Sequence, residues 1–280
     1  MPTKQQILEG IKKLTLFDDA LFRKAAESIE FCEEIIRVFL EDPMLIVLAN
    51  YSEKDFTNLQ GRSVVLDLFC QLGDGRMVNV EVQKRNDKDH VRRVRFNSAI
   101  VTTNITDPGT KFENVPDLIS IYVTEFDVFN KGQVKYVVDS VLRGYGDIVN
   151  DGVVRIFINC ANKDETKVSK LMTVFRGDVT YRKEFSKTNE IISRYTEKEE
   201  GISQMSNFIQ ELFEEELKEK VQEELQKKLQ EVQKDVQKDR ENMRKQVVEY
   251  MCSVVSMLEN KCSIDDIRNF TLNYMQKTTA

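Results

Sequence analysis

The feature that most constrains the fold is a pair of short segments joined by a tight turn near residue 75. The first segment, Ser63–Leu72, reads SVVLDLFCQL and is rich in β-branched and apolar side chains. After the turn Gly73-Asp74-Gly75-Arg76, the second segment, Met77–Gln83, alternates apolar and polar side chains in MVNVEVQ. Two such runs around a turn that contains Gly and Asp predict a β-hairpin.

Helical and strand patterns alternate on both sides of this hairpin. Residues 5–40 carry apolar side chains mostly at helical spacing, interrupted at Asp18 and Asp19, where a second helix could start. Further helices are predicted over residues 88–105, 164–176 and 187–195, and strands over 118–126, 134–141 and 153–159. This mixed order predicts an α/β or α+β fold, a sheet with helices on its faces.

The composition changes at about residue 203. From there to Arg244 the chain has no Gly or Pro, and it carries Glu/Lys pairs spaced for i,i+4 contacts. These pairs are Glu214 with Lys218, Glu216 with Lys220, and Glu223 with Lys227. The pattern predicts one long helix over residues 203–248 that could form a coiled coil, followed by a short helical end. We therefore expect two domains, residues 1–200 and 203–280.

The predicted long helix has a narrow apolar stripe with gaps of four or three residues. Its members are Leu217, Val221, Leu225, Leu229, Val232 and Val236. A narrow stripe gains little from burial on a lone helix, so we expect it to pack on a second copy of the chain or on the first domain. The alternative is a single solvated helix held by its ion pairs.

Charge and cysteine content exclude several classes of protein. The formal net charge of −6 argues against a protein that coats nucleic acid over its whole surface. The five cysteines are odd in number and form no CxxC pair, so neither a disulfide framework nor a zinc site is expected, and four of them lie in apolar runs that predict burial. His90, the one histidine, is expected to be an ordinary polar residue near a helix start.

Location and nucleic-acid contact can also be predicted. No apolar run approaches the ~20 residues that cross a bilayer, and the first residues lack the pattern of a secretory signal, so a cytoplasmic location is expected.

The densest basic stretch of the chain follows the hairpin, and only Asp87 and Asp89 oppose its charge. It comprises Lys84, Arg85, Lys88, Arg92, Arg93 and Arg95. These side chains could hold a DNA duplex by its phosphates or could form a solvated helix face.

Three polar residues of the hairpin are candidates for chemistry. Asp67 stands in an otherwise apolar strand, where an unpaired carboxylate is costly. Glu81 and Gln83 lie two apart on the next strand and share a face, and hairpin geometry can place Asp67 beside them. Two converging carboxylates would suit Mg²⁺ or Mn²⁺. Alternatively, Asp67 faces solvent and Glu81 and Gln83, with Asn79, form the polar face of an amphipathic strand.

The run LDLFCQLGDGRMVNVEVQ resembles the core motif of PD-(D/E)XK nucleases, in which an acid on one strand is followed by acid-x-lysine on the next. The nuclease-family transposase branch carries glutamine in place of the lysine, as at Gln83. That branch also has an upstream D-x-x-F-basic helix, here Asp19-Ala20-Leu21-Phe22-Arg23, and a later helix with Arg93-Val94-Arg95-Phe96-Asn97. The resemblance covers about residues 10–200.

The resemblance implies a restriction-endonuclease-like core and assigns roles to these residues. Asp67 and Glu81 would be ligands of Mg²⁺ or Mn²⁺, with the backbone carbonyl of Val82 as a further ligand. Gln83 would orient water or a phosphate oxygen, and Asp19 would either assist the metal or cap a helix. Two departures stand out: Leu66 occupies the motif's proline position, and Gln83 lacks the lysine charge.

The function implied by the resemblance is metal-dependent endonuclease cleavage of double-stranded DNA, of the transposase or recombination-promoting type. One alternative is a catalytically silent relative that binds DNA. Another is a scaffold that self-associates through residues 203–250. If the protein is an endonuclease, we expect a homodimer formed through the C-terminal helix.

Overall fold

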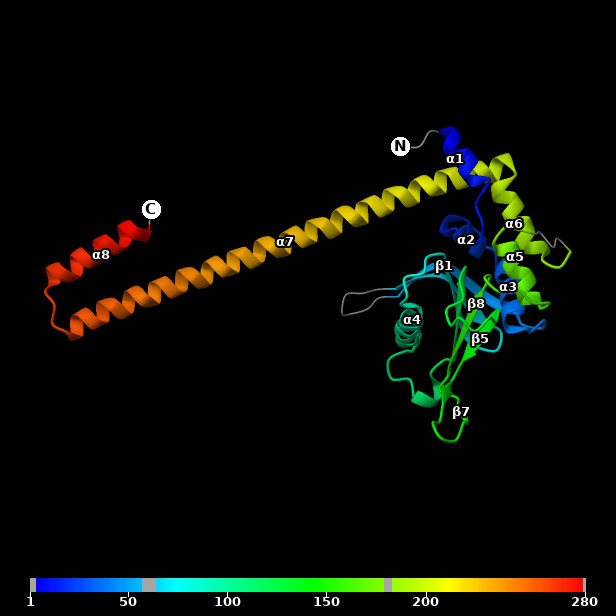
Figure 1. Cartoon of the computed structure of the whole chain (residues 1–280), viewed down its shortest axis with the longest axis horizontal. Coiled ribbons are helices and arrows are strands. Elements are labelled where there is room, and N and C mark those ends of the chain that lie inside the picture. The colour runs from blue at the N-terminus through cyan, green and yellow to red at the C-terminus, as the bar shows by residue number, and fades with distance from the viewer. Residues whose placement is uncertain (1–3, 57–63, 179–182, 279–280) are drawn as a thin grey trace. The chain divides into compact units, whose positions relative to one another are not determined.

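The computed structural model describes residues 4–56, 64–178 and 183–278. The chain forms two compact units, Met1–Glu211 and Leu212–Ala280, which we call the body and the tail (Figure 1). Ser63, the expected first residue of the hairpin, lies outside the described residues. None of the helices in the described part is long and apolar enough to cross a membrane.

The body is built on a six-stranded mixed sheet with the strand order β1-β2-β3-β4-β8-β5. Its strands are β1 (Val47–Phe56), β2 (Val64–Leu72), β3 (Met77–Gln83), β4 (Leu118–Thr124), β5 (Lys135–Val138) and β8 (Val153–Asn159). Strands β1 to β3 are antiparallel, β3, β4 and β8 are parallel, and β5 adds an antiparallel edge. Strands β6 (Ser140–Val141) and β7 (Ile148–Val149) pair separately.

The predicted hairpin is present as β2 and β3. Its turn needs Gly75, whose φ of 91° lies in the left-handed region that a residue with a Cβ rarely adopts. Leu68 pairs with Val80 and Gln71 with Met77, which fixes the register. In this register residues of the same parity on β2 and β3 point to the same face of the sheet.

Helices cover both faces of the sheet (Figure 1). Helix α4 (His90–Ile105) follows β3 after a short loop and lies on one face of the sheet. It connects to β4 through the 3₁₀ turn η1 (Phe112–Asn114). On the other face the buried side chains of the remaining body helices join those of the sheet in one cluster. These helices are α1 (Lys4–Ile11), α2 (Asp19–Ala26), α3 (Ile29–Leu40), α5 (Lys167–Phe175) and α6 (Ser186–Thr196).

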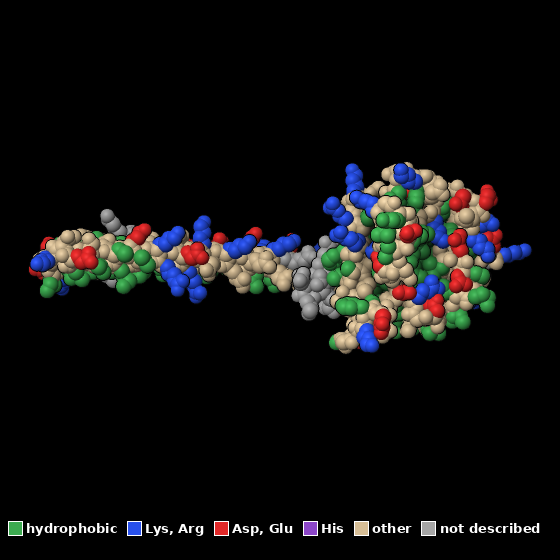
Figure 2. Space-filling view, turned by 90° about the horizontal axis from the view of Figure 1, so that it is seen from below, with side chains coloured by type: hydrophobic (Ala, Val, Ile, Leu, Met, Phe, Trp, Pro, Cys, Tyr) green, Lys and Arg blue, Asp and Glu red, His purple; other side chains and the backbone are tan. Residues whose placement is uncertain are grey.

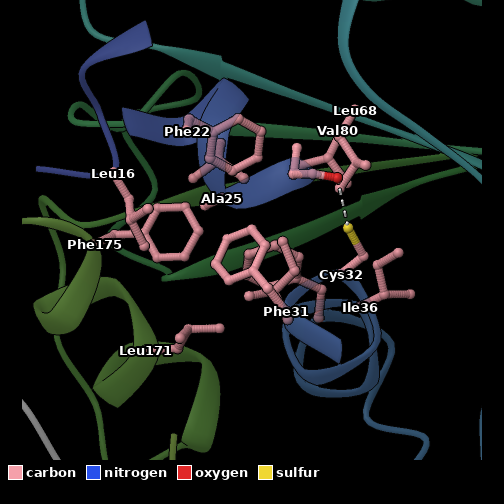
Figure 3. Close-up of a cluster of buried hydrophobic side chains, with 14 of the residues drawn as sticks. Leu16, Phe22, Ala25, Phe31, Cys32, Ile36, Leu68, Val80, Leu171 and Phe175 are labelled. Atoms are coloured by element: carbon pink, nitrogen blue, oxygen red, sulfur yellow. Dashed lines mark hydrogen bonds between the residues drawn. The ribbon is translucent and has the colours of Figure 1, made fainter. Parts of the chain in front are cut away.

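The main core lies between the sheet and the second group of helices. Phe22, Phe31 and Phe175 come from three different helices, and the ring centroid of Phe22 lies 6.0 Å from that of Phe31 and 6.2 Å from that of Phe175 (Figure 3). Leu68 and Val80 reach this cluster from the hairpin. Burial of these side chains holds β2 and β3 in place and leaves their opposite face to α4.

Helix α7 (Glu199–Glu259) begins in the body and continues through the tail. Its first turns belong to the body because Ile202 and Met205 are buried there, with Phe208 and Ile209 packed beside them. The two units therefore divide after Glu211, later than the change in composition at about residue 203. Helix α8 (Ile264–Thr278) completes the tail.

The predicted fold class, a mixed sheet flanked by helices with a long C-terminal helix, is confirmed. Some details differ. Ser28 caps a third N-terminal helix by accepting a hydrogen bond from Phe31 N–H, and β1 was not predicted. The strand expected over 134–141 is divided between β5 and β6. Burial of four cysteines is wrong, because Cys252 and Cys262 lie exposed on the tail while three cysteines are buried.

Candidate functional site

The candidate site lies where β2 separates from β3. The paired residues end at Leu68 and Val80, so Asp67 is the first residue beyond the ladder, next to Glu81. The Asp67 carboxylate spans the gap: its Oδ2 accepts a hydrogen bond of 2.8 Å from the backbone N–H of Val82. The acid at this position thereby serves as the acceptor for a backbone N–H of the neighbouring strand.

Glu81 is buried against helix α4. Its Oε1 accepts hydrogen bonds from Nδ2 of Asn97 at 2.7 Å and Nδ2 of Asn79 at 3.3 Å. These two amides fix the carboxylate from one side. In the part of the chain that the structure describes, no group donates a hydrogen bond to Oε2 of Glu81 or to Oδ1 of Asp67.

Asp67 and Glu81 line the same cavity, which has a volume of about 420 Å³. Its other polar walls carry both signs of charge and reach it from α2, the end of β3 and α4. They are Asp19, Gln83, Lys84, Arg85, Arg93 and Asn97, and Val82 also lines the cavity. The structure therefore brings together the three hairpin residues singled out from the sequence and Asp19.

The two carboxyl groups titrate far above their ordinary range. Burial raises the pKa of Glu81 to about 7, and the neighbouring Asp67 charge adds to the rise against the hydrogen bond from Asn97. Burial likewise raises the pKa of Asp67 to about 6, with Asp19 adding to it and the Val82 N–H opposing it. Two acids that are costly to ionise in one cavity are typical of a site that binds a cation or transfers a proton.

The donors at this cavity fit a hard divalent cation. Each carboxylate has one oxygen held by N–H donors and one oxygen to which no described residue donates. Oδ1 of Asn79, on the face of Glu81, is buried without a partner among the described residues. No group of three or more His, Cys, Asp or Glu side chains in the described ranges is arranged to hold a metal. Beyond the two carboxylates, oxygen ligands would have to come from the backbone, an amide or solvent.

Gln83 lies on the wall of this cavity at the end of β3. Its Nε2 donates a hydrogen bond of 3.0 Å to the carbonyl of Arg85 and lies 3.5 Å from Oδ2 of Asp87. The amide nitrogen is thereby held by the loop that follows β3, and the side chain brings no charge to the cavity.

Asp19 reaches the cavity from the first turn of α2. The residue in the N-cap position is Asp18, so Asp19 does not cap the helix. Oδ1 of Asp19 forms an ion pair of 2.8 Å with Nε of Arg23. Asp18 in turn holds Lys84 at 2.9 Å, which ties the start of α2 to the end of β3.

The six basic residues singled out from the sequence do not lie together. Lys84, Arg85 and Arg93 line the cavity, whereas Lys88, Arg92 and Arg95 are exposed outside it. Arg93 is the most enclosed of the six: its Nε is buried without a partner among the described residues, and its Nη2 is 3.6 Å from Asp87 and from Asp89. The basic stretch therefore has an inner part beside the acids and an outer part on the free side of α4.

Asn97 and Asn79, which hold Glu81, have no role that the sequence alone predicted. A sequence signal exists for Asn97, since it follows Arg93 by four positions and so shares its side of α4. His90 was expected to be an ordinary polar residue at a helix start, and it is the first residue of α4. Its ring nitrogens bond to Tyr122 Oη and Asn86 Oδ1, both at 2.9 Å, and burial lowers its pKa.

The raised pKa values predict that the metal-free protein loses stability as the pH rises. Asp67 and Glu81 have folded-state pKa values of about 6 and about 7, above the ordinary values of 3.8 and 4.5. Between about pH 4 and 7 the folded state therefore binds more protons than the unfolded state, and stability falls with pH. For Glu81 the loss is on the order of 3 kcal/mol at pH 8.

Glu81→Gln removes this penalty, so the variant should melt about 9 °C above the wild type at pH 8 in EDTA and close to it at pH 4.5. Thermal denaturation followed by circular dichroism measures the shift. Glu113→Gln, the same substitution at a residue whose side chain is 72% exposed, serves as control and should change neither melt. A Glu81→Gln protein that melts below the wild type at pH 8 would contradict the conclusion that the buried charge of Glu81 destabilises the folded protein.

Comparison with known protein families identifies a match over most of the chain. A family model described as PD-(D/E)XK nuclease family transposase matches residues 24–246, well over half of the chain. No curated protein matches the chain significantly, and no solved structure does.

Proposed function

Since the chain belongs to the PD-(D/E)XK nuclease family transposases, we propose that it is a metal-dependent endonuclease that hydrolyses phosphodiester bonds in double-stranded DNA. The observation that supports this most directly is the cavity shared by Asp67 and Glu81. Both acids have raised pKa values there, and each has a carboxylate oxygen to which no described residue donates a hydrogen bond.

In this proposal Asp67 and Glu81 hold Mg²⁺ or Mn²⁺, and the backbone carbonyl of Val82 adds an oxygen. When bound, the cation supplies positive charge that stabilises the phosphoryl transition state and makes water a better nucleophile. Asn97 and Asn79 keep the Glu81 carboxylate in one orientation through its Oε1. Gln83 uses its amide oxygen to orient water or a phosphate oxygen, because its nitrogen is held by Arg85.

The remaining charged residues position the substrate. Lys84, Arg85 and Arg93 contact the phosphate that enters the cavity, and Lys88, Arg92 and Arg95 contact neighbouring phosphates of the duplex. Asp19 adds a third negative charge at the cavity wall and orients Arg23. We further propose that the protein acts in the cytoplasm as a homodimer formed through the tail, with the body as the nuclease domain and the tail as the helical extension.

A catalytically silent DNA-binding relative is the second candidate, and one observation favours it. Gln83 is uncharged, and its amide nitrogen is bonded to the protein rather than directed to a substrate. The cavity then relies on Arg93 and Arg85 for positive charge at the phosphate. A protein that acts only as a self-associating scaffold does not require two buried acids with raised pKa values in one cavity.

Nicking of supercoiled plasmid separates these functions. The wild type is expected to convert plasmid to the open circular form with Mg²⁺ or Mn²⁺ and not in EDTA, whereas Asp67→Ala is expected to leave the plasmid intact. Retention of plasmid on a gel without nicking by either protein would support the silent DNA-binding relative. Equal nicking by wild type and Asp67→Ala would remove Asp67 from the proposed site.

A further inference from the structure

The apolar stripe of α7 is uncovered in the structure of the tail. Leu217, Val221, Leu225, Leu229, Val232 and Val236, which we call the tail stripe, are each 50–68% exposed. Apolar side chains are visible at the surface of the tail among Lys and Arg side chains (Figure 2). A row of large aliphatic side chains along one side of a helix marks a surface that packs against another element.

The other helix of the tail does not cover this stripe. Helix α8 folds back on α7 through Tyr250, which contacts Phe270 and Tyr274 and bonds to Thr271 at 2.9 Å. Tyr274 reaches the carbonyl of Gln246. A helix of 15 residues is roughly 22 Å long, so it spans α7 back to about this residue and stops short of Val236.

The spacing of the tail stripe is nearly the same in both directions. Read from Leu217 the gaps are four, four, four, three and four, and read from Val236 they are four, three, four, four and four. If two copies of α7 run antiparallel about a point close to Gln226, Leu217 faces Val236, Val221 faces Val232, and Leu225 faces Leu229. Each apolar side chain then meets an apolar side chain of the second copy.

The charge of α7 is polarised along the same segment. Residues 211–224 contain seven Glu and two Lys, a net charge of −5, whereas residues 227–245 contain seven Lys and Arg and four acids, a net charge of +3. Parallel copies would place the acidic ends together, and like charges in register destabilise a helix pair. Antiparallel copies place each acidic half beside a basic half, which favours that orientation and the correct register.

We propose that the tail stripe is the interface of a homodimer in which α7 pairs antiparallel with α7 of a second copy. A twofold axis near Gln226 makes each contact occur twice, as in a closed isologous dimer. Beside the stripe, Glu211 faces Arg244 of the second copy, and Glu224 faces Lys228 of the second copy. Glu214 and Asp239 lie at equal distances from the axis, so they face each other in the pair as well.

Disulfide trapping in the full-length protein tests the orientation. The exposed Cys252 and Cys262 are first replaced by serine, and Leu217→Cys and Val236→Cys are made in separate chains with tags of different size. Antiparallel pairing predicts a mixed disulfide between the two chains and no disulfide within either sample alone, because the two copies of residue 217 lie 19 residues apart along the pair, roughly 28 Å. Gln230→Cys, on the opposite side of the helix, is the matched control and should remain reduced.

Light scattering supplies the second measurement. The wild type is expected to have twice the mass of one chain, and Leu225→Asp with Leu229→Asp is expected to give a monomer with unchanged melting of the body. A Leu217→Cys sample that forms its own disulfide would show parallel pairing and overturn the proposal. A wild type that stays monomeric at high concentration would also overturn it. The inference deepens the proposed homodimer, but neither result depends on DNA cleavage, so its failure is distinguishable from failure of the proposed nuclease activity.

Discussion

Glu81→Gln is expected to lower Mg²⁺-dependent nicking of plasmid at least about 100-fold while the protein remains folded. The substitution removes one of the two carboxylate charges at the cavity and barely changes the side-chain volume. Replacement of even an outer partner of a metal ligand costs roughly 10–100-fold in affinity or activity, so loss of a ligand charge should cost more. Asn97 can still donate its hydrogen bond to the amide oxygen of the new side chain.

The measurement is the initial rate of nicking at saturating Mg²⁺, with Glu113→Gln as the matched control. Because Glu81→Gln also relieves the buried charge, the inactive variant should be the more stable protein at pH 8 in EDTA. Loss of activity together with a raised melting temperature separates a functional role from misfolding, since a misfolded variant would lose both. Nicking at the wild-type rate would remove Glu81 from the mechanism.

Local patterns in the sequence predicted the part of the site that depends on one hairpin. The alternation in β3 fixes the face that Glu81 and Gln83 share, and the turn fixes which residue of β2 stands opposite. These relations span fewer than twenty residues and depend only on strand geometry. The position of Asp67 beside Glu81 is of this kind, and both line one cavity in the structure.

Features that depend on distant parts of the chain could not be predicted in the same way. Asn97 contacts Glu81 only because α4 packs on the sheet, and Lys84 is tied to Asp18 across 66 positions. Strand β1 was missed because its sequence, VLANYSEKDF, mixes polar and charged residues without regular alternation. It forms at the edge of the sheet by pairing with β2, so tertiary context rather than local propensity determines it.

The first turns of α7 illustrate the same limit. Composition changes at about residue 203, yet Met205 is fully buried in the body and Phe208 packs beside it. A chain cut at Thr196 would expose this part of the core, so point substitutions in the tail stripe are the better test of self-association.

DNA binding is expected to depend on the basic side chains of α4. Replacement of Arg92, Arg93 and Arg95 with alanine is expected to weaken binding to duplex DNA about 10²-fold at 0.1 M salt. Each phosphate contact contributes about 0.9 to the slope of log affinity against log salt, so three lost contacts should lower the slope by about 2.7. Arg92 and Arg95 are exposed on the free side of the helix, and Arg93 faces the cavity, so the three sample both parts of the basic stretch.

Fluorescence anisotropy with a labelled duplex at several salt concentrations measures both quantities, in Ca²⁺ or EDTA so that the DNA stays intact. The matched control is a triple alanine variant at exposed positions that do not line the cavity, Lys12, Lys13 and Lys131. It changes the net charge by the same amount and should leave the slope nearly unchanged. Arg93→Ala alone should lower the slope by about 0.9 and reduce nicking more than binding, because it removes a positive charge that acts on both Asp67 and Glu81. A triple variant with wild-type affinity and slope would place the duplex on another surface of the body.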